Sequence, residues 1–289
     1  MKMVIDSHAH IGNLWVLNLN VRKVLWSMEQ YGVDFSLVSS IESTEYYEKG
    51  KHLPWPLRKT TMCVCRKTVR AVKRHPDKLG ALLWIQTGKR IPYKRLCRFI
   101  EKNRQYIYGI KIHPYRSEVA PDDPRTEPVY ELARRFGLPV AAHTGDIEQA
   151  MTSHLYNAAK AHPDVRFIAV HMDLESGNQK AIEYISQLPN IYGDTTWVPV
   201  ASALRAIERC GSEKILFGTD NPIDGKQHML YNRAGQRSLC QEYFNEFKTM
   251  VSTEAYENVM HKNAERVFGI SPDVVKGQAF YLIDSYTEA

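Results

Sequence analysis

Two histidines one residue apart, His8 and His10, stand near the start of the chain, within residues 4–12. The apolar residues before them predict a β-strand, and alternate side chains of a strand point to the same face. The two imidazoles would then converge where the strand ends, at Gly12. A pair of this kind can hold a metal ion. The alternative interpretation is a polar strand end with two chance histidines, and the rest of the chain has to decide.

Further metal-ligand residue types follow other apolar runs. Lys111 and His113 lie at the end of one such run. Three later runs end with His143, His171 and Asp220 in turn. A single histidine at a strand end is usually structural. Several strand ends carrying histidine or aspartate are better explained by a shared metal site. Imidazole and carboxylate ligands suit zinc, which we expect first, with manganese and iron as alternatives.

The segments that must position these residues alternate between strand and helix patterns. Strands are predicted at residues 4–12, 34–39, 79–85, 108–114, 139–143, 165–171, 191–195 and 214–220. Helices are predicted at residues 21–31, 62–74, 93–103, 129–136, 147–161, 178–187, 199–209, 239–250 and 253–268. Eight strands each followed by a helix predict an α/β fold of the (β/α)8 TIM-barrel type, in which the strand ends share one rim.

The alternative fold is a doubly wound open sheet, but no Gly-x-Gly-x-x-Gly motif or P-loop follows a strand. We expect residues 1–289 to form a single domain. Residues 42–61 are predicted to be a long loop. The tail is expected to be irregular from about residue 271, with a short edge strand at residues 279–283.

The ensemble of motifs resembles the amidohydrolase superfamily. The resembling residues are His8-Ala9-His10, His143, His171 and Phe217-Gly218-Thr219-Asp220-Asn221-Pro222. The details look most like the amidohydrolase-related family (amidohydrolase 2), which includes aminocarboxymuconate-semialdehyde decarboxylase and dicarboxylate lactone hydrolases. The resemblance covers nearly the whole chain and is more specific for the superfamily than for a substrate.

The resemblance implies roles for particular residues. His8, His10, His143 and Asp220 match the ligands of one metal ion, and His171 matches a catalytic histidine or a ligand of a second metal. Lys111 is either a carboxylated lysine that bridges two metals or an ordinary lysine that pairs with a substrate carboxylate or an acidic neighbour. We favour the ordinary lysine, because this branch of the superfamily is mostly mononuclear by resemblance.

Two reactions follow from this site. The main expectation is hydrolysis of an ester, lactone or amide of a small, anionic substrate, with Asp220 moving the proton and His171 steadying the oxyanion. The alternative is non-oxidative decarboxylation at the same site. Many decarboxylases of the family have a glycine-rich stretch after the histidine of the sixth strand. This chain has Met172-Asp173-Leu174-Glu175 there instead, which weighs against decarboxylation. His113, Arg116 and Trp197 are candidates for substrate binding.

Composition limits the remaining classes of function. The chain has 38 basic and 32 acidic residues and a formal net charge of +6, which indicates either a small anionic substrate or ordinary solubility. No arginine-rich tract stands out, and we expect no nucleic-acid partner. No apolar run could span a membrane. Five cysteines without zinc-finger spacing indicate reduced thiols and a cytoplasmic location. The sequence is compatible with a homodimer.

Overall fold

The structure is a computed structural model that describes residues 3–15, 17–223 and 239–277. Its centre is a nine-stranded sheet in the order β11-β10-β9-β8-β7-β6-β3-β1-β2. All neighbours in it are parallel except β2, which pairs antiparallel with β1. The strands are β1 (Ile5–Leu14), β2 (Leu17–Leu19), β3 (Phe35–Ser40), β6 (Leu79–Trp84), β7 (Ile107–Ile112), β8 (Val140–Gly145), β9 (Phe167–Leu174), β10 (Ile191–Asp194) and β11 (Ile215–Leu216).

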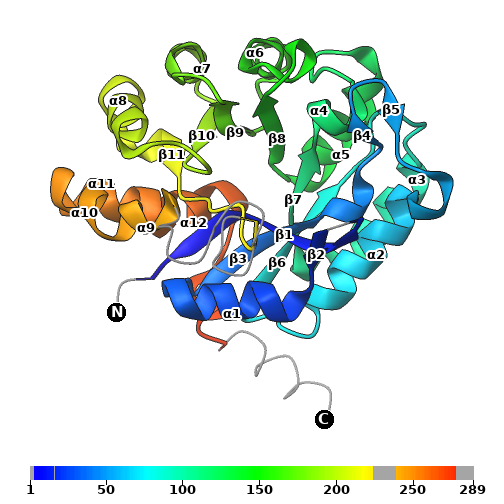
Figure 1. The fold of residues 1–289 in the computed structure, drawn as a ribbon, viewed down its shortest axis with the longest axis horizontal. Coiled ribbons are helices and arrows are strands. Elements are labelled where there is room, and N and C mark those ends of the chain that lie inside the picture. Colours follow the sequence, from blue (N-terminus) through cyan, green and yellow to red (C-terminus); the bar gives the residue numbers. More distant parts are fainter. Residues whose placement is uncertain (1–2, 16, 224–238, 278–289) are drawn as a thin grey trace.

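The sheet is curled, and its two ends approach each other (Figure 1). The segment after β11 runs beside β1: the Asp220 N–H donates to the His8 carbonyl at 2.8 Å, and the His10 N–H donates to the Asn221 carbonyl at 2.7 Å. The predicted barrel is therefore confirmed as a mixed α/β fold with a curled parallel sheet. The prediction differs in that the strand ladder has nine members and stays open between β11 and β1.

Helices surround the sheet (Figure 1), and the first shows how sequence sets their ends. Helix α1 begins after Asn20, whose side chain accepts from the Lys23 N–H, and it ends at Gly32 in the left-handed conformation. The other α-helices are α2 (Thr61–Val72), α3 (Tyr93–Asn103), α4 (Pro114–Ser117), α5 (Glu127–Phe136), α6 (Thr152–Ala161), α7 (Gln179–Gln187), α8 (Val200–Cys210), α9 (Leu239–Phe244), α10 (Glu246–Met250), α11 (Thr253–Glu257), α12 (Asn263–Phe268) and α13 (Pro272–Val275), with α1 at Val21–Tyr31.

Some predicted boundaries were wrong. Residues 42–61 are not one loop, because a hairpin of β4 (Tyr46–Glu48) and β5 (Lys51–His52) and a turn of 3₁₀ helix, η2 (Trp55–Leu57), lie within them. The helix predicted from residue 147 begins at Thr152. The tail contains the short helix α13, whereas the edge strand predicted at residues 279–283 lies outside the described residues.

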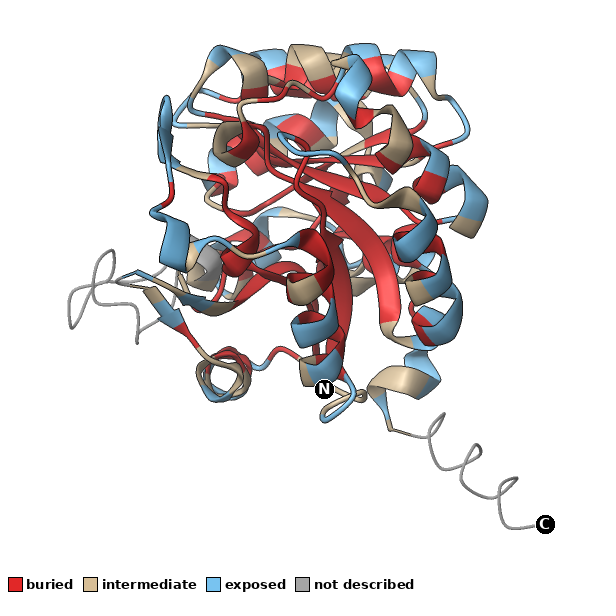
Figure 2. Ribbon diagram, turned by 90° about the vertical axis from the view of Figure 1, so that its right-hand side faces the viewer, coloured by how far each residue is buried: buried red, intermediate tan, exposed pale blue. Residues whose placement is uncertain are grey.

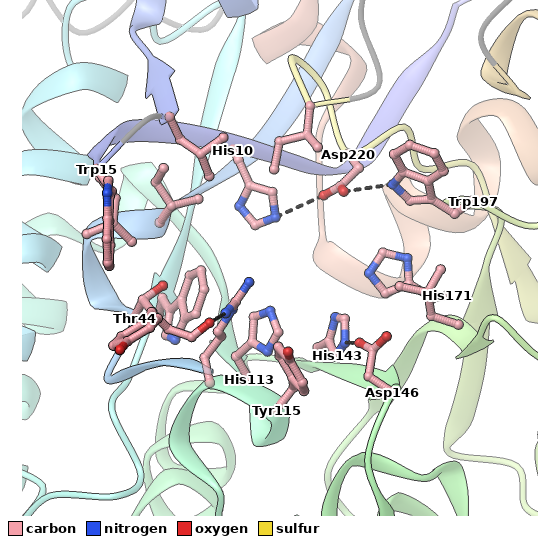
Figure 3. Close-up of a pocket in the computed structure, with 18 of the residues that line it drawn as sticks. His10, Trp15, Thr44, His113, Tyr115, His143, Asp146, His171, Trp197 and Asp220 are labelled. Carbon is pink, nitrogen blue, oxygen red and sulfur yellow. Dashed lines mark hydrogen bonds and ion pairs between the residues drawn. The ribbon is translucent and has the colours of Figure 1, made fainter. Parts of the chain in front are cut away.

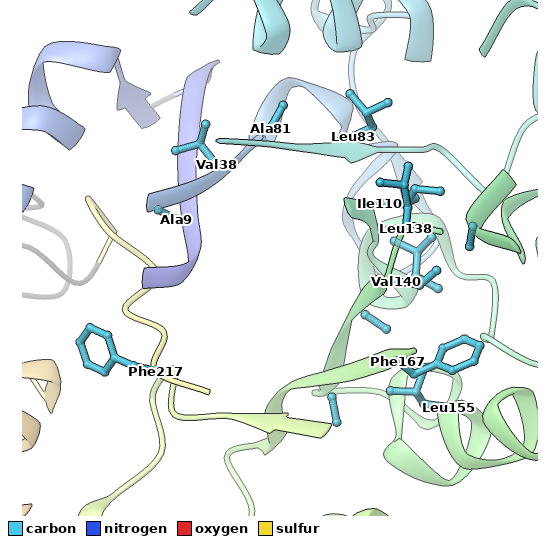
Figure 4. Close-up of a cluster of buried hydrophobic side chains, with 14 of the residues drawn as sticks. Ala9, Val38, Ala81, Leu83, Ile110, Leu138, Val140, Leu155, Phe167 and Phe217 are labelled. Atoms are coloured by element: carbon cyan, nitrogen blue, oxygen red, sulfur yellow. The ribbon is translucent and has the colours of Figure 1, made fainter. Parts of the chain in front are cut away.

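The apolar core has two layers. The larger one packs the outer helices against the sheet, and Figure 4 shows Val38, Ile110 and Val140 within it. The smaller one includes Phe35 and Leu82 and is covered by apolar residues of α12. Successive side chains along a strand therefore point into opposite layers. The strands are buried along most of their length (Figure 2). In the described part of the chain, no helix is long and apolar enough to cross a membrane.

Candidate metal centre and pocket

Three predicted ligands meet at one end of the strands. His8 Nε2 lies 3.0 Å from His10 Nε2, and Asp220 Oδ1 lies 3.5 Å from the first nitrogen and 3.0 Å from the second. All three side chains are buried, and their ligand atoms lie within 4.8 Å of one another. Figure 3 shows His10 and Asp220 pointing toward each other at the wall of the pocket.

The chain around β1 fixes both histidines. Asp6 accepts hydrogen bonds from the His8 N–H at 3.0 Å and from the Thr219 N–H at 3.1 Å, so one carboxylate ties β1 to the segment that carries Asp220. His10 Nδ1 faces the Ser39 hydroxyl at 3.1 Å, which leaves Nε2 directed at the pocket. Such partners set the tautomer and the orientation of a ligand histidine.

Asp220 is held in place by its own backbone and by an indole. Its φ of +65° puts it in the left-handed region, and the Trp197 Nε1–H donates to Oδ2 at 2.8 Å. Burial alone would raise the pKa of Asp220, but the hydrogen-bonded contact with His10 holds it well below its usual range. The side chain is therefore an ionised carboxylate, the form that can bind a cation or accept a proton.

Two buried ionisable residues, Lys111 and Asp194, contact His8. Lys111 Nζ is 3.4 Å from His8 Nε2, and Asp194 Oδ2 is 3.5 Å from His8 Nδ1. Burial lowers the pKa of Lys111 and raises the pKa of Asp194, because the interior disfavours both charges. Burial, together with the charge of Lys111, also lowers the pKa of His8 well below its usual range. His8 is therefore neutral, as a ligand must be.

The fourth predicted ligand, His143, contacts other groups. Its Nε2 lies 2.6 Å from Asp146 Oδ2. Its ring stacks on His113 at a centroid distance of 4.0 Å, and His113 stacks in turn on Trp84 at 4.8 Å. Burial lowers the pKa of both histidines well below their usual range. His143 thus lies in the pocket (Figure 3), but its ligand atom is not among the three that converge.

His171 lies between these two groups. Its ring centroid is 4.7 Å from that of His143 and 5.4 Å from that of His8. Its ring Nδ1 faces the Thr196 carbonyl at 3.1 Å, and its backbone N–H donates to Asp194 Oδ1 at 2.9 Å. Burial lowers the pKa of His171 to about 3, so the ring is neutral.

The centre opens into a cavity of about 890 Å³. Arg116 is the only lysine or arginine among the described residues that line it, and its guanidinium donates to the Tyr47 carbonyl at 2.7 Å and lies 4.7 Å from the centre of the Tyr115 ring. Five aromatic side chains contribute to the wall, namely Trp15, Tyr47, Trp84, Tyr115 and Trp197. Such a cavity suits a flat, apolar ligand that carries a few polar groups.

The donor set fits a divalent metal ion. Two ligands that bind one ion at about 2.0–2.2 Å, with angles of about 90–110° between them, stand about 2.8–3.6 Å apart. The three distances in the trio, 3.0, 3.0 and 3.5 Å, fall in this range. Two imidazoles and one carboxylate are a donor set that zinc, manganese and iron accept.

Sequence reasoning placed all the predicted residues near one site but missed several of their partners. The contact between Asp146 and His143 was not predicted. Asp146 follows His143 by three residues, and a turn at Gly145 could have suggested that the two side chains meet. Trp197 was predicted as a substrate contact, and in the structure it lines the cavity and also holds Asp220. Asp194 ends β10 and contacts both His8 and His171.

Comparison with known proteins addresses what this centre belongs to. Residues 95–270, more than half of the chain, match the amidohydrolase family. The chain belongs to this family. The resemblance drawn from His8-Ala9-His10, His143, His171 and residues 217–222 is thereby confirmed at the level of the family. No curated protein matches this amidohydrolase in sequence.

Solved structures with a similar fold cover nearly the whole amidohydrolase chain. A 5-carboxyvanillate decarboxylase from Sphingomonas paucimobilis is 15% identical, with a TM-score of 0.68, and the match covers 94% of this chain and 100% of that one. A dihydroxybenzoic acid decarboxylase from Polaromonas sp. JS666, with bound manganese and the inhibitor 2-nitroresorcinol, is 14% identical (TM-score 0.66; 93% and 97% covered). A probable 2-pyrone-4,6-dicarboxylic acid hydrolase from Acinetobacter baumannii, with citric acid bound, is 14% identical (TM-score 0.63; 92% and 99% covered). At these identities the likeness concerns the fold.

Proposed function

We propose that this amidohydrolase is a metal-dependent decarboxylase of a small acid whose carboxyl group is joined to an aromatic or conjugated system. The observation that carries the proposal is the convergence of His8, His10 and Asp220 at one end of a cavity walled by aromatic side chains. The named activities of two structures with a similar fold support the choice of decarboxylation, since both are decarboxylases of aromatic acids.

His8, His10 and Asp220 would hold the ion, and His143 is the proposed fourth ligand once its Nε2 leaves Asp146. A bound zinc, manganese or iron ion would supply positive charge that fixes the acid and its neighbouring oxygen. Lys111 is proposed to remain an ordinary lysine, because it already lies between His8 and the charges of Asp194 and Asp220.

The chain's own residues would do the rest. In decarboxylation the bond from the ring carbon to the carboxyl carbon breaks, carbon dioxide leaves, and the electron pair left on the ring carbon takes up a proton. Asp220 is ionised, so it can collect a proton from water or from a substrate hydroxyl and pass it to that carbon. His171 is neutral and lies beside His8, where it can hydrogen-bond the substrate.

The cavity walls would set orientation. The aromatic side chains would pack against the substrate ring, and His113 and Trp197 would contact its edges. Arg116 would bind a second anionic or polar group of the substrate, at the side of the cavity that Tyr47 and Tyr115 form. We also propose that the segment after β11 completes a (β/α)8 barrel, since its backbone bonds to β1 take the place of a ladder.

Hydrolysis is the second candidate, favoured by one observation. Asp220 is ionised and lies beside the two histidines that would hold the ion, where its carboxylate can accept a proton from water. A lactone or ester acid would then be the substrate, as the name of the similar pyrone hydrolase suggests.

One panel separates the two reactions. Protein loaded with manganese or zinc is incubated with hydroxybenzoic acids, muconate-type acids and pyrone carboxylic acids, and both carbon dioxide and acid release are recorded. Decarboxylation predicts carbon dioxide from at least one acid and none with Asp220→Asn. Acid release from lactones without carbon dioxide would replace the proposal by hydrolysis, and no turnover of any acid or lactone would contradict both.

A further inference from the structure

The charges of this chain are unevenly distributed. Residues 58–104 contain 15 lysines and arginines but only two acidic residues, Asp77 and Glu101. The whole chain has 38 basic and 32 acidic residues, so the other 242 residues contain 23 basic and 30 acidic ones. The modest net charge of the chain therefore conceals one strongly basic region and a mildly acidic remainder.

Helix α2 presents much of this charge to solvent. Its exposed side chains include Arg66, Lys67, Arg70 and, one turn further, Lys73 and Arg74 just beyond its end. This spacing puts them on one face of the helix, opposite the buried apolar residues. Lys67 pairs with Glu42 at 2.9 Å, and Lys73 lies over the Tyr106 ring at 5.0 Å.

Helix α3 continues the same surface. Lys94, Arg95, Arg98 and Lys102 are exposed on it and share its outer side with a single carboxylate, Glu101. Helices α2 and α3 contact each other and lie together on the right of Figure 1. We call the exposed lysines and arginines of α2 and α3 the basic face.

An exposed indole precedes α2 in the chain, in the 3₁₀ turn η2. Trp55 is 81% exposed, the largest value among the exposed large apolar side chains of the described residues. It lies in η2 between the exposed prolines Pro54 and Pro56, which restrict the backbone that presents it. Leu53, two residues before, is buried and lines the cavity, so the indole is close along the chain to the pocket entrance.

We propose that the basic face and Trp55 form a docking site for the surface of an anionic phospholipid bilayer. Clustered lysines and arginines are attracted to a plane of lipid phosphates, and their long stems let the charges reach it. An exposed indole in the segment that leads into α2 can enter the headgroup region of the same bilayer. A bilayer offers the exposed indole of Trp55 a boundary between polar and apolar layers as well as phosphates for the lysines and arginines, whereas a nucleic-acid duplex offers only the phosphates, which favours the bilayer.

Vesicle flotation tests the proposal. The full chain is mixed with vesicles of phosphatidylcholine alone or with about one third phosphatidylglycerol, at low and at high salt. We expect binding to the anionic vesicles only, and its loss at high salt. Reversing three charges, Arg66→Glu, Arg70→Glu and Arg98→Glu, should weaken binding by about 100-fold. A control with the same change in net charge, Lys160→Glu, Lys180→Glu and Arg209→Glu on α6, α7 and α8, should bind as the wild type does.

Trp55→Ser should weaken binding by about fivefold or more, and the emission difference between wild type and Trp55→Phe should move to shorter wavelength on anionic vesicles. Failure to bind the anionic vesicles, or equal weakening by the control reversals, would overturn the proposal. Binding to a DNA duplex with no vesicle binding would also overturn it and assign the face to nucleic acid. None of these outcomes depends on catalysis, so the proposed decarboxylation is tested separately.

Discussion

Histidines occur on two sides of the pocket, and the two sides differ in what the rings contact. On one, the ligand side, His8 and His10 come from a single strand and their Nε2 atoms meet at 3.0 Å beside Asp220. On the other, the stacked side, His113 follows β7, and His143 and His171 lie in β8 and β9. The rings of His113 and His143 stack at 4.0 Å, and the ring of His171 stands edge-on to that of His143 at 4.7 Å.

The difference follows from strand geometry. Residues i and i+2 of one strand point to the same spot, whereas residues on adjacent parallel strands stay about 4.8 Å apart. Side chains at that spacing stack, unless one of them turns toward a shared partner. The comparison predicts that a metal ion depends first on the ligand side and only then on the stacked side.

The largest effect is expected from His10→Ala. Removing one of two imidazoles from the trio should reduce bound metal from about one ion per chain to less than about a tenth, and turnover should fall by at least about 1000-fold. Elemental analysis after dialysis gives the metal content. His75→Ala, which changes a histidine outside the pocket, is the control and should keep its metal. Full metal retention in His10→Ala would refute the proposal that the ligand side binds the metal ion.

A smaller effect is expected from His143→Ala. If His143 is the fourth ligand, its loss should weaken manganese binding by about 10- to 100-fold without abolishing it. Asp146→Asn is the matched variant: because Asp146 competes for the same Nε2, weakening that contact should leave the affinity for manganese equal to or higher than that of the wild type. An affinity unchanged in His143→Ala would confine the metal to the ligand side.

Trp197→Phe tests the support of Asp220. The substitution keeps an aromatic wall but removes the hydrogen bond from Nε1 to Asp220 Oδ2. Turnover should drop about tenfold with metal still bound, because the carboxylate is less well oriented. Turnover equal to that of the wild type, measured at saturating substrate, would mean that the indole only lines the cavity.

The smallest effect concerns protonation on the stacked side. Because burial lowers the pKa of His171 to about 3, its ring should stay neutral between pH 8 and pH 5. In ¹⁵N-histidine spectra, the signal assigned by His171→Asn should not shift over this range, whereas an ordinary histidine titrates near 6.5. A titration midpoint near 6.5 for that signal would contradict the lowering of the His171 pKa by burial.

The sequence was sufficient for the features that periodicity controls. The spacing of His8 and His10 predicted their convergence, and the apolar runs located all eight parallel strands to within a few residues. The helix predicted at residues 147–161 began late, because a 3₁₀ turn occupies Glu148–Ala150, which also fit a helical pattern.

The partners of the site residues were harder to predict. Asp146, Trp197 and Asp220 all have left-handed backbones, with φ of +70°, +59° and +65°. No periodic pattern predicts where such residues aim their side chains, so the contacts of Asp146 with His143 and of Trp197 with Asp220 emerge only in three dimensions. The basic face was missed for another reason: the charge of the whole chain averages over it.

The most direct test of the account titrates manganese into metal-free protein and records bound metal and carbon dioxide release in the same samples, using an acid selected from the panel. The account predicts that release rises with occupancy and saturates at about one ion per chain, while His10→Ala binds no manganese and releases none. Carbon dioxide release that is independent of manganese, or that persists in His10→Ala, would contradict it.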